Sequence, residues 1–387
     1  MRNTVHKKGL HTYGEIRKEL RLKELELDEL ICKGRENEAK KKAAALARDA
    51  GSFHVYDIVI SCHKYLRKYH YCVNSTLYKN SVSQIEKFTY LLNDEEQICD
   101  FYHDLRKCFK RNRTLTESII SKSLEYSSII EEKKNAKDSR GRPILRGPFF
   151  MRDYYYINCV HYSVMKDFEA QIKYALEGYE YFDQRFLHFD RVKYNLLTYI
   201  IEGYFAIKDY ENAERFLELQ SSINLEVDYM SKVLSQQVAA RIEMIVKDSP
   251  YSVCIGDTSR GEDEDYSQLI RLYQCILEGE EPTKEYNVGA YHYTDSTGYG
   301  VAVHIARCII SRINDNHLDE EKRIKQFVWE KLKDDPRSKL MFDYLINSTD
   351  VRKELSKHTW NHEIEIIPYE DMIKRIEAFK PTLPLHQ

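Results

Sequence analysis

Four side chains that commonly bind metals cluster within eleven residues of the sequence. The stretch SCHKYLRKYHYC (61–72) contains Cys62, His63, His70 and Cys72. Zinc sites built from thiolates and imidazoles usually place paired ligands two to four residues apart around a turn. Cys62 and His63 are adjacent instead, and would point about 100° apart on a helix. We therefore expect no metal site in this protein.

A second possible chemistry is nucleophilic catalysis by a cysteine. His304 and Cys308 are four residues apart and would share one helix face, as a base and a nucleophile could. Both fall among Val301, Ile305 and Ile309, where a small thiol and a hydrogen-bonded imidazole are ordinary core residues. The sequence also contains no HExxH or GxSxG motif. These observations favour a non-enzymatic protein without catalytic residues.

A glycine pair ahead of the same apolar segment raises the question of phosphate binding. Gly298 and Gly300 could present backbone amides to an anion at the start of a helix. Their spacing fits neither GxGxxG nor GxxxxGK[ST], so we expect no bound cofactor. One alternative stays open, in which residues 285–387 form a small catalytic domain with His292 and Asp295 converging on His304 and Cys308.

Two basic stretches could bind nucleic acid. RKCFKRNR (106–113) contains five cations and RGRPILR (140–146) adds three more. The formal net charge of the chain is only −3, so attraction to nucleic acid or to an anionic membrane would have to be local. A nucleic-acid-associated regulator that uses these two stretches is the alternative to a protein-binding function. We expect no membrane partner.

Composition describes a helical, cytoplasmic protein with a large core. The chain has 387 residues, 42 % of them apolar and 31 % charged, with only 14 Gly and 8 Pro to interrupt helices. No apolar run approaches the ~20 residues that a bilayer-spanning helix requires. The nine cysteines are an odd number and form no CxxC pair, which is typical of reduced thiols. We therefore expect a cytoplasmic location.

Apolar periodicity places long helices along most of the first 250 residues. Residues 14–49 read as one polar helix or as two helices interrupted at Gly34. About four antiparallel helices should follow within 53–133, and residues 228–247 should form another. The segment 133–150 contains two Gly and two Pro and is expected to be a loop. The residues expected on the buried faces within 53–133 are Val55, Ile58, Val59, Cys62, Leu66, Leu105, Phe109, Ile119, Ile120 and Leu124.

The C-terminal third has a different character. An acidic segment rich in Pro, Gly and Ser, residues 248–268, indicates a domain boundary. Beyond it, residues 269–387 predict a small, mainly helical module. EIEIIPY (363–369) is the best candidate for a strand.

One helix-turn-helix pattern occurs twice in the middle of the chain. With Phe168 and Tyr210 taken as equivalent, an offset of 42 residues superimposes both stretches. The matching positions are Tyr155, Tyr162, Asp167, Phe168 and Gly178 in the first copy, and Leu197, Tyr204, Asp209, Tyr210 and Ala213 in the second. This pattern over residues 150–225 resembles the tetratricopeptide repeat, a helical hairpin of 34 residues whose small positions allow close helix contact. Gln171 and Gln220 stand where the repeat has alanine.

The resemblance implies a mostly α fold, in which antiparallel helical hairpins stack as a tetratricopeptide-like α-solenoid. The expected organisation is an N-terminal polar helix region (1–52), a repeat domain (53–247), the acidic linker (248–268), and a C-terminal module with a short strand (269–387). Such a fold favours a scaffold or adaptor that binds a protein or peptide on its concave face. By the resemblance, that face is lined by Tyr156, Val160 and Ser163 of the first copy, and by Asn195, Thr198, Glu202 and Phe205 of the second.

Overall fold

The protein divides into two compact units. The computed structural model describes residues 13–112, 117–186, 189–223, 229–246, 270, 273–274, 301–302, 305–306, 308–309, 335–347, 349–361 and 365–378. The first unit comprises Met1–Arg111 and Thr116–Leu196, and the second comprises Asn112–Leu115 and Leu197–Gln387. The division thus falls near residue 196, inside a helix. The acidic segment 248–268, where the sequence predicted a boundary, lies outside the described residues.

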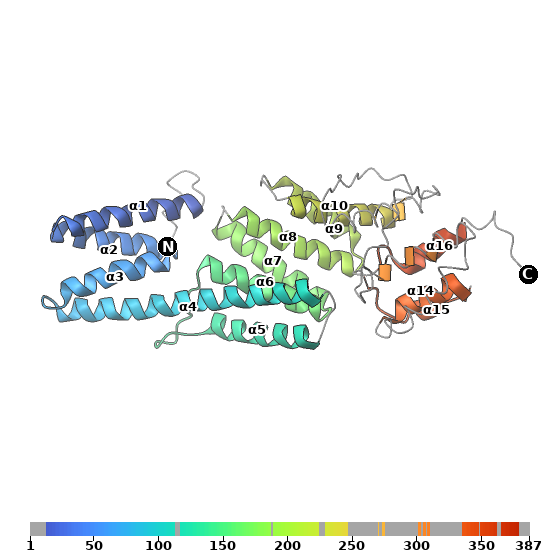
Figure 1. The fold of residues 1–387 in the computed structure, drawn as a ribbon, viewed down its shortest axis with the longest axis horizontal. Helices are drawn as coiled ribbons and strands as arrows, with labels where there is room; N and C mark the ends of the chain where they lie inside the picture. Colours follow the sequence, from blue (N-terminus) through green and yellow to red (C-terminus); the bar gives the residue numbers. More distant parts are fainter. Residues whose placement is uncertain are drawn as a thin grey trace, which may run out of the picture. The chain divides into compact units, whose positions relative to one another are not determined.

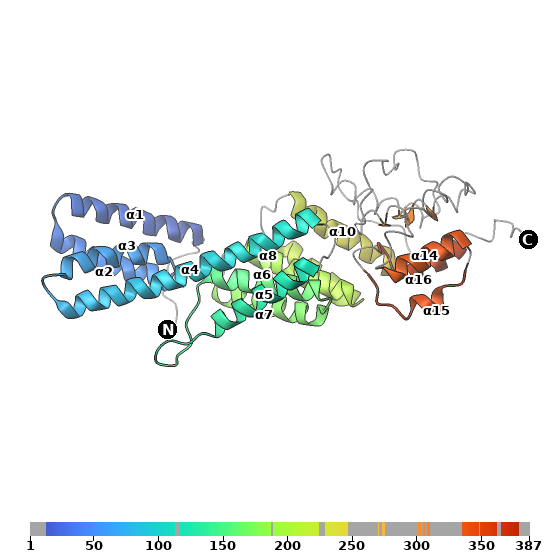
Figure 2. The ribbon, with the colours of Figure 1, turned by 60° about the horizontal axis from the view of Figure 1, so that its bottom comes forward.

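Helices make up the regular secondary structure of the first unit within its described residues (Figure 1). They are α1 (Tyr13–Cys32), α2 (Glu36–Ser52), α3 (Tyr56–His70), α4 (Ser75–Asn112), α5 (Glu117–Asn135), α6 (Pro148–Val164), α7 (Phe168–Arg185) and the beginning of α8 (Asp190–Ala206). Consecutive helices pack on their neighbours, α1 on α2, α2 on α3, α5 on α6, and α6 on α7. The helix α4 contains 38 residues and extends from α3 along α5 and α6 (Figure 2). The prediction of a mainly helical protein is confirmed.

The helices α1 to α3 share one apolar core. On α3 the predicted face is confirmed, since the side chains of Val55, Ile58, Val59, Cys62 and Leu66 are all buried. Alanines line the facing side of α2, which lets the two helices approach closely. Leucines from α1 complete this core, whose buried members outside α3 are Leu20, Leu27, Ala39, Ala43, Leu46, Ala47 and Ala50.

The same backbone turn joins four pairs of consecutive helices. In each, one residue takes a positive φ after the first helix: Gly34 between α1 and α2, His54 between α2 and α3, Lys166 between α6 and α7, and Lys208 between α8 and α9 (Tyr210–Ser222). Two backbone hydrogen bonds close this turn, as when Asp167 N–H donates to the Tyr162 carbonyl and Lys166 N–H to that of Ser163. The predicted interruption at Gly34 is therefore confirmed.

The two copies of the sequence pattern share this turn and its cap. Asp167 accepts the Ala170 N–H at 3.0 Å, and Asp209 accepts the Asn212 N–H at 3.2 Å. Each carboxylate satisfies an amide that the first turn of a helix leaves unpaired. The offset of 42 residues thus relates two hairpins with the same local geometry. At a position where the repeat has alanine, Gln220 is buried and donates from Nε2 to the Thr198 hydroxyl at 2.9 Å, which ties α9 to α8.

In the second unit, α10 (Tyr229–Val246) shares a core with the C-terminal helices. These are α14 (Pro336–Asn347), α15 (Arg352–Leu355) and α16 (Tyr369–Ala378). Ala240 and Met244 of α10 are buried in the same cluster as Phe342 and Ile373. Arg241 donates to the backbone carbonyls of residues 365 and 366 at 2.9 Å each. The helix at 229–246 therefore packs with the C-terminal part of the chain, from which the sequence-based boundary had separated it.

The predicted strand at 363–369 is absent from its described part. Residues 365–368 are bends and coil, and Tyr369 already begins α16. This segment is held by side chains, since Arg337, which is 2 % exposed, bonds Glu365 through both carboxylate oxygens at 2.5 and 2.9 Å. In the described part of this segment, Ile366 and Ile367 are buried and Glu365 forms a buried ion pair with Arg337.

Within the part of the chain that the structure describes, the helices lack the length and apolar character that crossing a bilayer requires.

Candidate functional site

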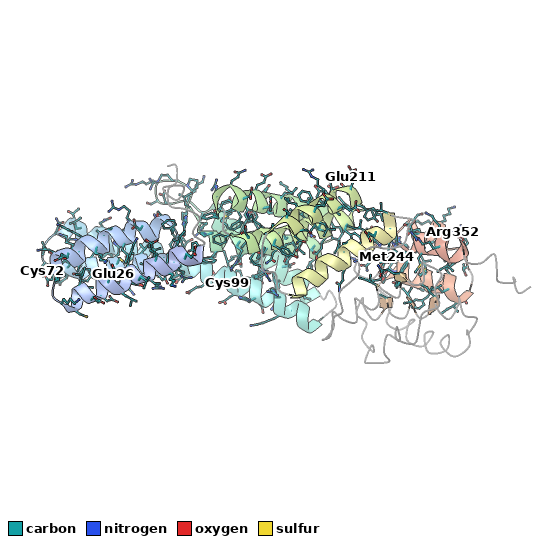
Figure 3. All side chains as sticks on the ribbon, turned by 90° about the horizontal axis from the view of Figure 1, so that it is seen from above. Glu26, Cys72, Cys99, Glu211, Met244 and Arg352 are labelled. Atoms are coloured by element: carbon teal, nitrogen blue, oxygen red, sulfur yellow. The ribbon has the colours of Figure 1, made fainter. Side chains whose placement is uncertain are left out.

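The best candidate site in the described residues is a band of polar and aromatic side chains on the first unit. We name it the α4–α6 strip and define it by Glu95, Cys99, Tyr102 and Arg106 of α4, Arg152, Asp153 and Tyr156 of α6, and Asn195 of α8. The spacing of the α4 members places them on one helix face. Figure 3 labels Cys99 midway along α4. Neighbouring helices thus present aromatic, amide and guanidinium groups together.

A fixed guanidinium group lies in the middle of the strip. Arg152 donates from Nε and Nη2 to the two carboxylate oxygens of Asp153, at 2.7 Å each. The Asp153 side chain is 1 % exposed, whereas that of Arg152 is 28 % exposed. The guanidinium also lies over the Phe149 ring, 5.4 Å from its centroid. A planar cation held this way is pre-organised to bind an incoming carboxylate.

Glu95 supplies a neutral carboxyl group at one end of the strip. Burial raises the pKa of Glu95 to about 8, and the charge of Asp153 adds to the shift, while the Phe150 N–H, Arg152 and Arg146 oppose it. The helix N-cap residue Gly147 makes this approach possible, because a Cβ there would overlap Glu95 Oε1. Burial also raises the pKa of the Cys99 thiol. Near pH 7 both groups are therefore mostly protonated, and Arg106 and Arg152 give the strip positive charge.

An aromatic pair and an amide form the other end of the strip. The rings of Tyr102 and Tyr156 lie 5.3 Å apart, and Asn195 Nδ2 donates to the Tyr156 hydroxyl at 3.1 Å. Arg106 extends over the Tyr102 ring, 5.8 Å from its centroid. Tyr156 is 3 % exposed and Tyr102 is half-buried, so Tyr102 and the cation present the accessible surface. This arrangement can bind a polar or acidic chain through a ring, an amide and two cations.

The seven residues predicted to line a concave face fall in both units. Tyr156, Val160, Ser163 and Asn195 belong to the first unit, where Tyr156 and Asn195 contact each other and Val160 and Ser163 are half-buried. Thr198, Glu202 and Phe205 belong to the second, where Thr198 accepts the bond from Gln220.

Phe205 lies in the interior of the second unit. It is 1 % exposed and packs with Ala213, Ile242 and Trp360. Its ring lies 5.1 Å from that of Trp360. The hairpin pattern placed Phe205 on an open face, but side chains from segments 37 and 155 residues further along the chain cover it. Such coverage cannot be inferred from the hairpin alone.

Sequence reasoning missed Glu95, Tyr102, Arg152 and Asp153. The recurrence of polar and aromatic residues at positions 95, 99, 102 and 106 was the available signal. It was weak, because most exposed helix faces are polar as well.

Part of the predicted basic patch is internal. The Arg146 side chain is 2 % exposed and bonds Asp94 at 2.6 Å, while Lys133 pairs with the same carboxylate. Arg142 is exposed but paired with Asp138, also at 2.6 Å. In the other basic stretch, Arg106 and Lys107 are exposed, whereas the side chains from Phe109 onward lie outside the described residues. Arg146 is thus unavailable to a nucleic acid.

The possible metal ligands within residues 61–72 lie in different environments, some buried and some exposed. Cys62 is buried in the α1–α3 core, and this burial raises the pKa of its thiol to about 12. Cys72 is exposed, and His70 is buried. Among the described residues no group of three or more His, Cys, Asp or Glu is arranged to hold a metal ion. His292, Asp295, Gly298 and His304 lie outside those residues, and Cys308 is buried.

Comparisons with protein-family models, with curated proteins and with solved structures gave no match.

Proposed function

We propose that this protein is a non-enzymatic scaffold of tetratricopeptide-like helical hairpins that binds a protein or peptide partner. The observation that carries this proposal is the accessible set of Tyr102, Arg106 and Arg152. The buried Asp153 holds Arg152 on α6, the buried Tyr156 of α6 contacts Tyr102, and Arg106 lies over the Tyr102 ring. In hairpins of this type the first helix of each pair faces the partner, and α6 is such a helix. The repeated turn and its aspartate caps support the relationship between the two hairpins.

The charge of the strip favours an acidic peptide. With Glu95 protonated, Arg106 and Arg152 outnumber the one buried anion, Asp153. Arg152 can donate to a carboxylate through guanidinium hydrogens that do not bond Asp153, while Tyr102 offers a ring face to an apolar or aromatic side chain. The alternative based on nucleic acid has less support, because Arg146 and Arg142 are already paired.

Selection of peptides by phage display on the purified chain, followed by fluorescence anisotropy, tests the proposal. We expect enrichment of acidic peptides. Arg106→Glu should weaken their binding at least about tenfold, as loss of a central contact typically does.

Lys107→Glu is the matched control. It makes the same change in net charge at the next position. Lys107 is exposed and lies near Asp104, which is not part of the strip. Its affinity should remain within about twofold of the unchanged protein. Equal losses in both variants would indicate general charge attraction and would count against a site at the strip.

A further inference from the structure

The turn between α3 and α4 exposes apolar side chains to solvent. Tyr71 and Val73 are each 71 % exposed and Leu77 is 41 % exposed. The seven residues from Tyr71 to Leu77 are all exposed, and Cys72 marks this turn at the end of the helices in Figure 3. Single exposed apolar side chains are common on proteins, but several grouped in one turn indicate a binding surface.

The turn has a defined local structure. Asn74 Oδ1 accepts the Leu77 N–H at 3.0 Å and thereby caps the start of α4. The Tyr71 ring lies edge-on to that of Tyr78, with the centroids 5.6 Å apart. On the other side, the Tyr69 hydroxyl donates to Asn37 Oδ1 at 3.3 Å and joins the end of α3 to the beginning of α2. The apolar groups are thus presented by an ordered tip.

The surroundings of this tip carry positive charge. Residues 58–85 contain no Asp or Glu, although the chain has 62 of them. The cations of this stretch are Lys64, Arg67, Lys68 and Lys79, all exposed and none in an ion pair among the described residues. Lys40 of α2 lies over the Tyr69 ring at 4.8 Å and adds another positive charge.

Two of the acidic groups near the tip are paired with cations. On the adjacent α1–α2 turn, Lys33 pairs with Glu29 and Arg35 pairs with Glu38. Burial raises the pKa of Tyr65 on α3, and the charge of Glu36 on α2 adds to the shift. The tip therefore combines exposed apolar groups with a surplus of cations.

We propose that the α3–α4 turn binds the surface of an anionic lipid bilayer. Tyr71, Val73 and Leu77 enter the interface between headgroups and acyl chains, and the four cations contact the headgroups. Tyrosine and aliphatic side chains are favourable at that depth, and Lys and Arg near it are attracted by anionic lipids. This binding places the protein on a membrane, and it is independent of the proposed peptide site.

A lipid surface fits the tip better than nucleic acid does. Phosphates would match Lys64, Arg67 and Lys68, but they give no contact for the exposed aliphatic groups of Val73 and Leu77. This proposal departs from the expectation of no membrane partner, because that expectation rested on the net charge and on apolar segment length. Neither quantity detects a short exposed turn that carries local positive charge.

Sedimentation of the full chain with lipid vesicles tests the proposal. We expect binding to vesicles of phosphatidylcholine with phosphatidylserine, little binding to phosphatidylcholine alone, and weakening as salt is raised. The double change Tyr71→Ser with Val73→Ser should reduce binding at least about tenfold, and Arg67→Glu with Lys68→Glu should do the same. Circular dichroism melting checks that each variant is folded.

The matched control removes two other exposed apolar side chains. Leu22 and Leu25 of α1 are 53 % and 61 % exposed, and Leu22→Ser with Leu25→Ser should leave vesicle binding within about twofold. Absence of binding to anionic vesicles, or equal loss in this control, would overturn the proposal. Binding to duplex DNA or RNA that depends on Arg67 and Lys68 but not on Tyr71 and Val73, without vesicle binding, would replace lipid by nucleic acid.

Discussion

Gly178 of α7 lies directly against the ring of Tyr155 on α6: a Cβ at residue 178 would be only 2.8 Å from Tyr155 Cγ. Tyr155 is 5 % exposed, so its ring cannot move aside into solvent. The two helices of this hairpin therefore approach closely at the one residue type without a side chain. Gly178 was among the positions that the sequence pattern singled out.

Gly178→Ala should destabilise the protein although alanine is the better helix former. We expect the free energy of unfolding to fall by about 1–3 kcal/mol, the usual cost of overpacking. Gly51→Ala in α2 is the control, because its Cβ would have its nearest neighbours at 3.9 Å. At residue 51 only the higher helix propensity of alanine should matter, and it should raise the free energy of unfolding by about 0.5–1 kcal/mol. Chemical denaturation measures both changes, and a stabilised Gly178→Ala protein would disprove this contact.

Glu95 should make stability fall as the pH rises. The folded-state pKa of about 8 exceeds the ordinary value of 4.5, so the folded protein keeps a proton that the unfolded chain releases. The stabilisation is fully present below about pH 4.5 and is lost as the pH approaches 8, at up to about 1.4 kcal/mol per pH unit.

Glu95→Gln should therefore flatten the dependence of stability on pH across this window. Denaturation curves at several pH values measure the difference from the unchanged protein. Glu96→Gln, at the exposed neighbouring position, should leave the original slope. If the Glu95→Gln and unchanged proteins lose stability in parallel, Glu95 does not hold the proton.

Lys166 occupies a backbone conformation that suits glycine. Its φ is 57° and its side chain is exposed. Lys166→Gly should raise the free energy of unfolding by about 0.5–1 kcal/mol, because relief of the left-handed conformation exceeds the added freedom of the unfolded chain. Lys173→Gly inside α7 should lower it by about 1 kcal/mol. Thermal melting measures both changes. A loss of stability in both variants would argue against the left-handed backbone conformation of Lys166.

Phe205 should behave as a core residue. Arg241 lies over its ring at 4.5 Å, and the ring is 1 % exposed. Phe205→Ala should lower the free energy of unfolding by about 3–5 kcal/mol. Ile207→Ala, two residues further on and 41 % exposed, should cost about 0.5 kcal/mol or less. Similar small losses of stability in both variants would indicate that Phe205 lies on an open face.

The helices and their turns follow from information within a few residues. The apolar period of α3, the interruption at Gly34 and the aspartate caps at Asp167 and Asp209 depend on contacts between neighbours in the chain. Such signals can be read directly, because helix geometry relates each residue to those three and four positions away.

The sides of those helices that face the core depend on which other helices cover them. Ile120 and Leu124 were expected to be buried beside Ile119, yet they are 36 % and 57 % exposed. Arg146 reads as a surface cation but is internal, because Asp94, 52 residues earlier, receives it. These partners are far apart in sequence, so local patterns cannot identify them.

The sequence by itself determined a helical chain, the turn at Gly34 and the pair of related hairpins. It divided residues 53–133 into about four helices, where the structure has α3, α4 and α5, because the length of α4 depends on the helices that it packs against. Tertiary structure alone decided that Phe205 is internal, that Glu95 keeps its proton and that the α3–α4 tip remains uncovered. The physical reason is that helix formation is governed by hydrogen bonds between near neighbours, whereas burial and protonation depend on groups brought together from distant segments.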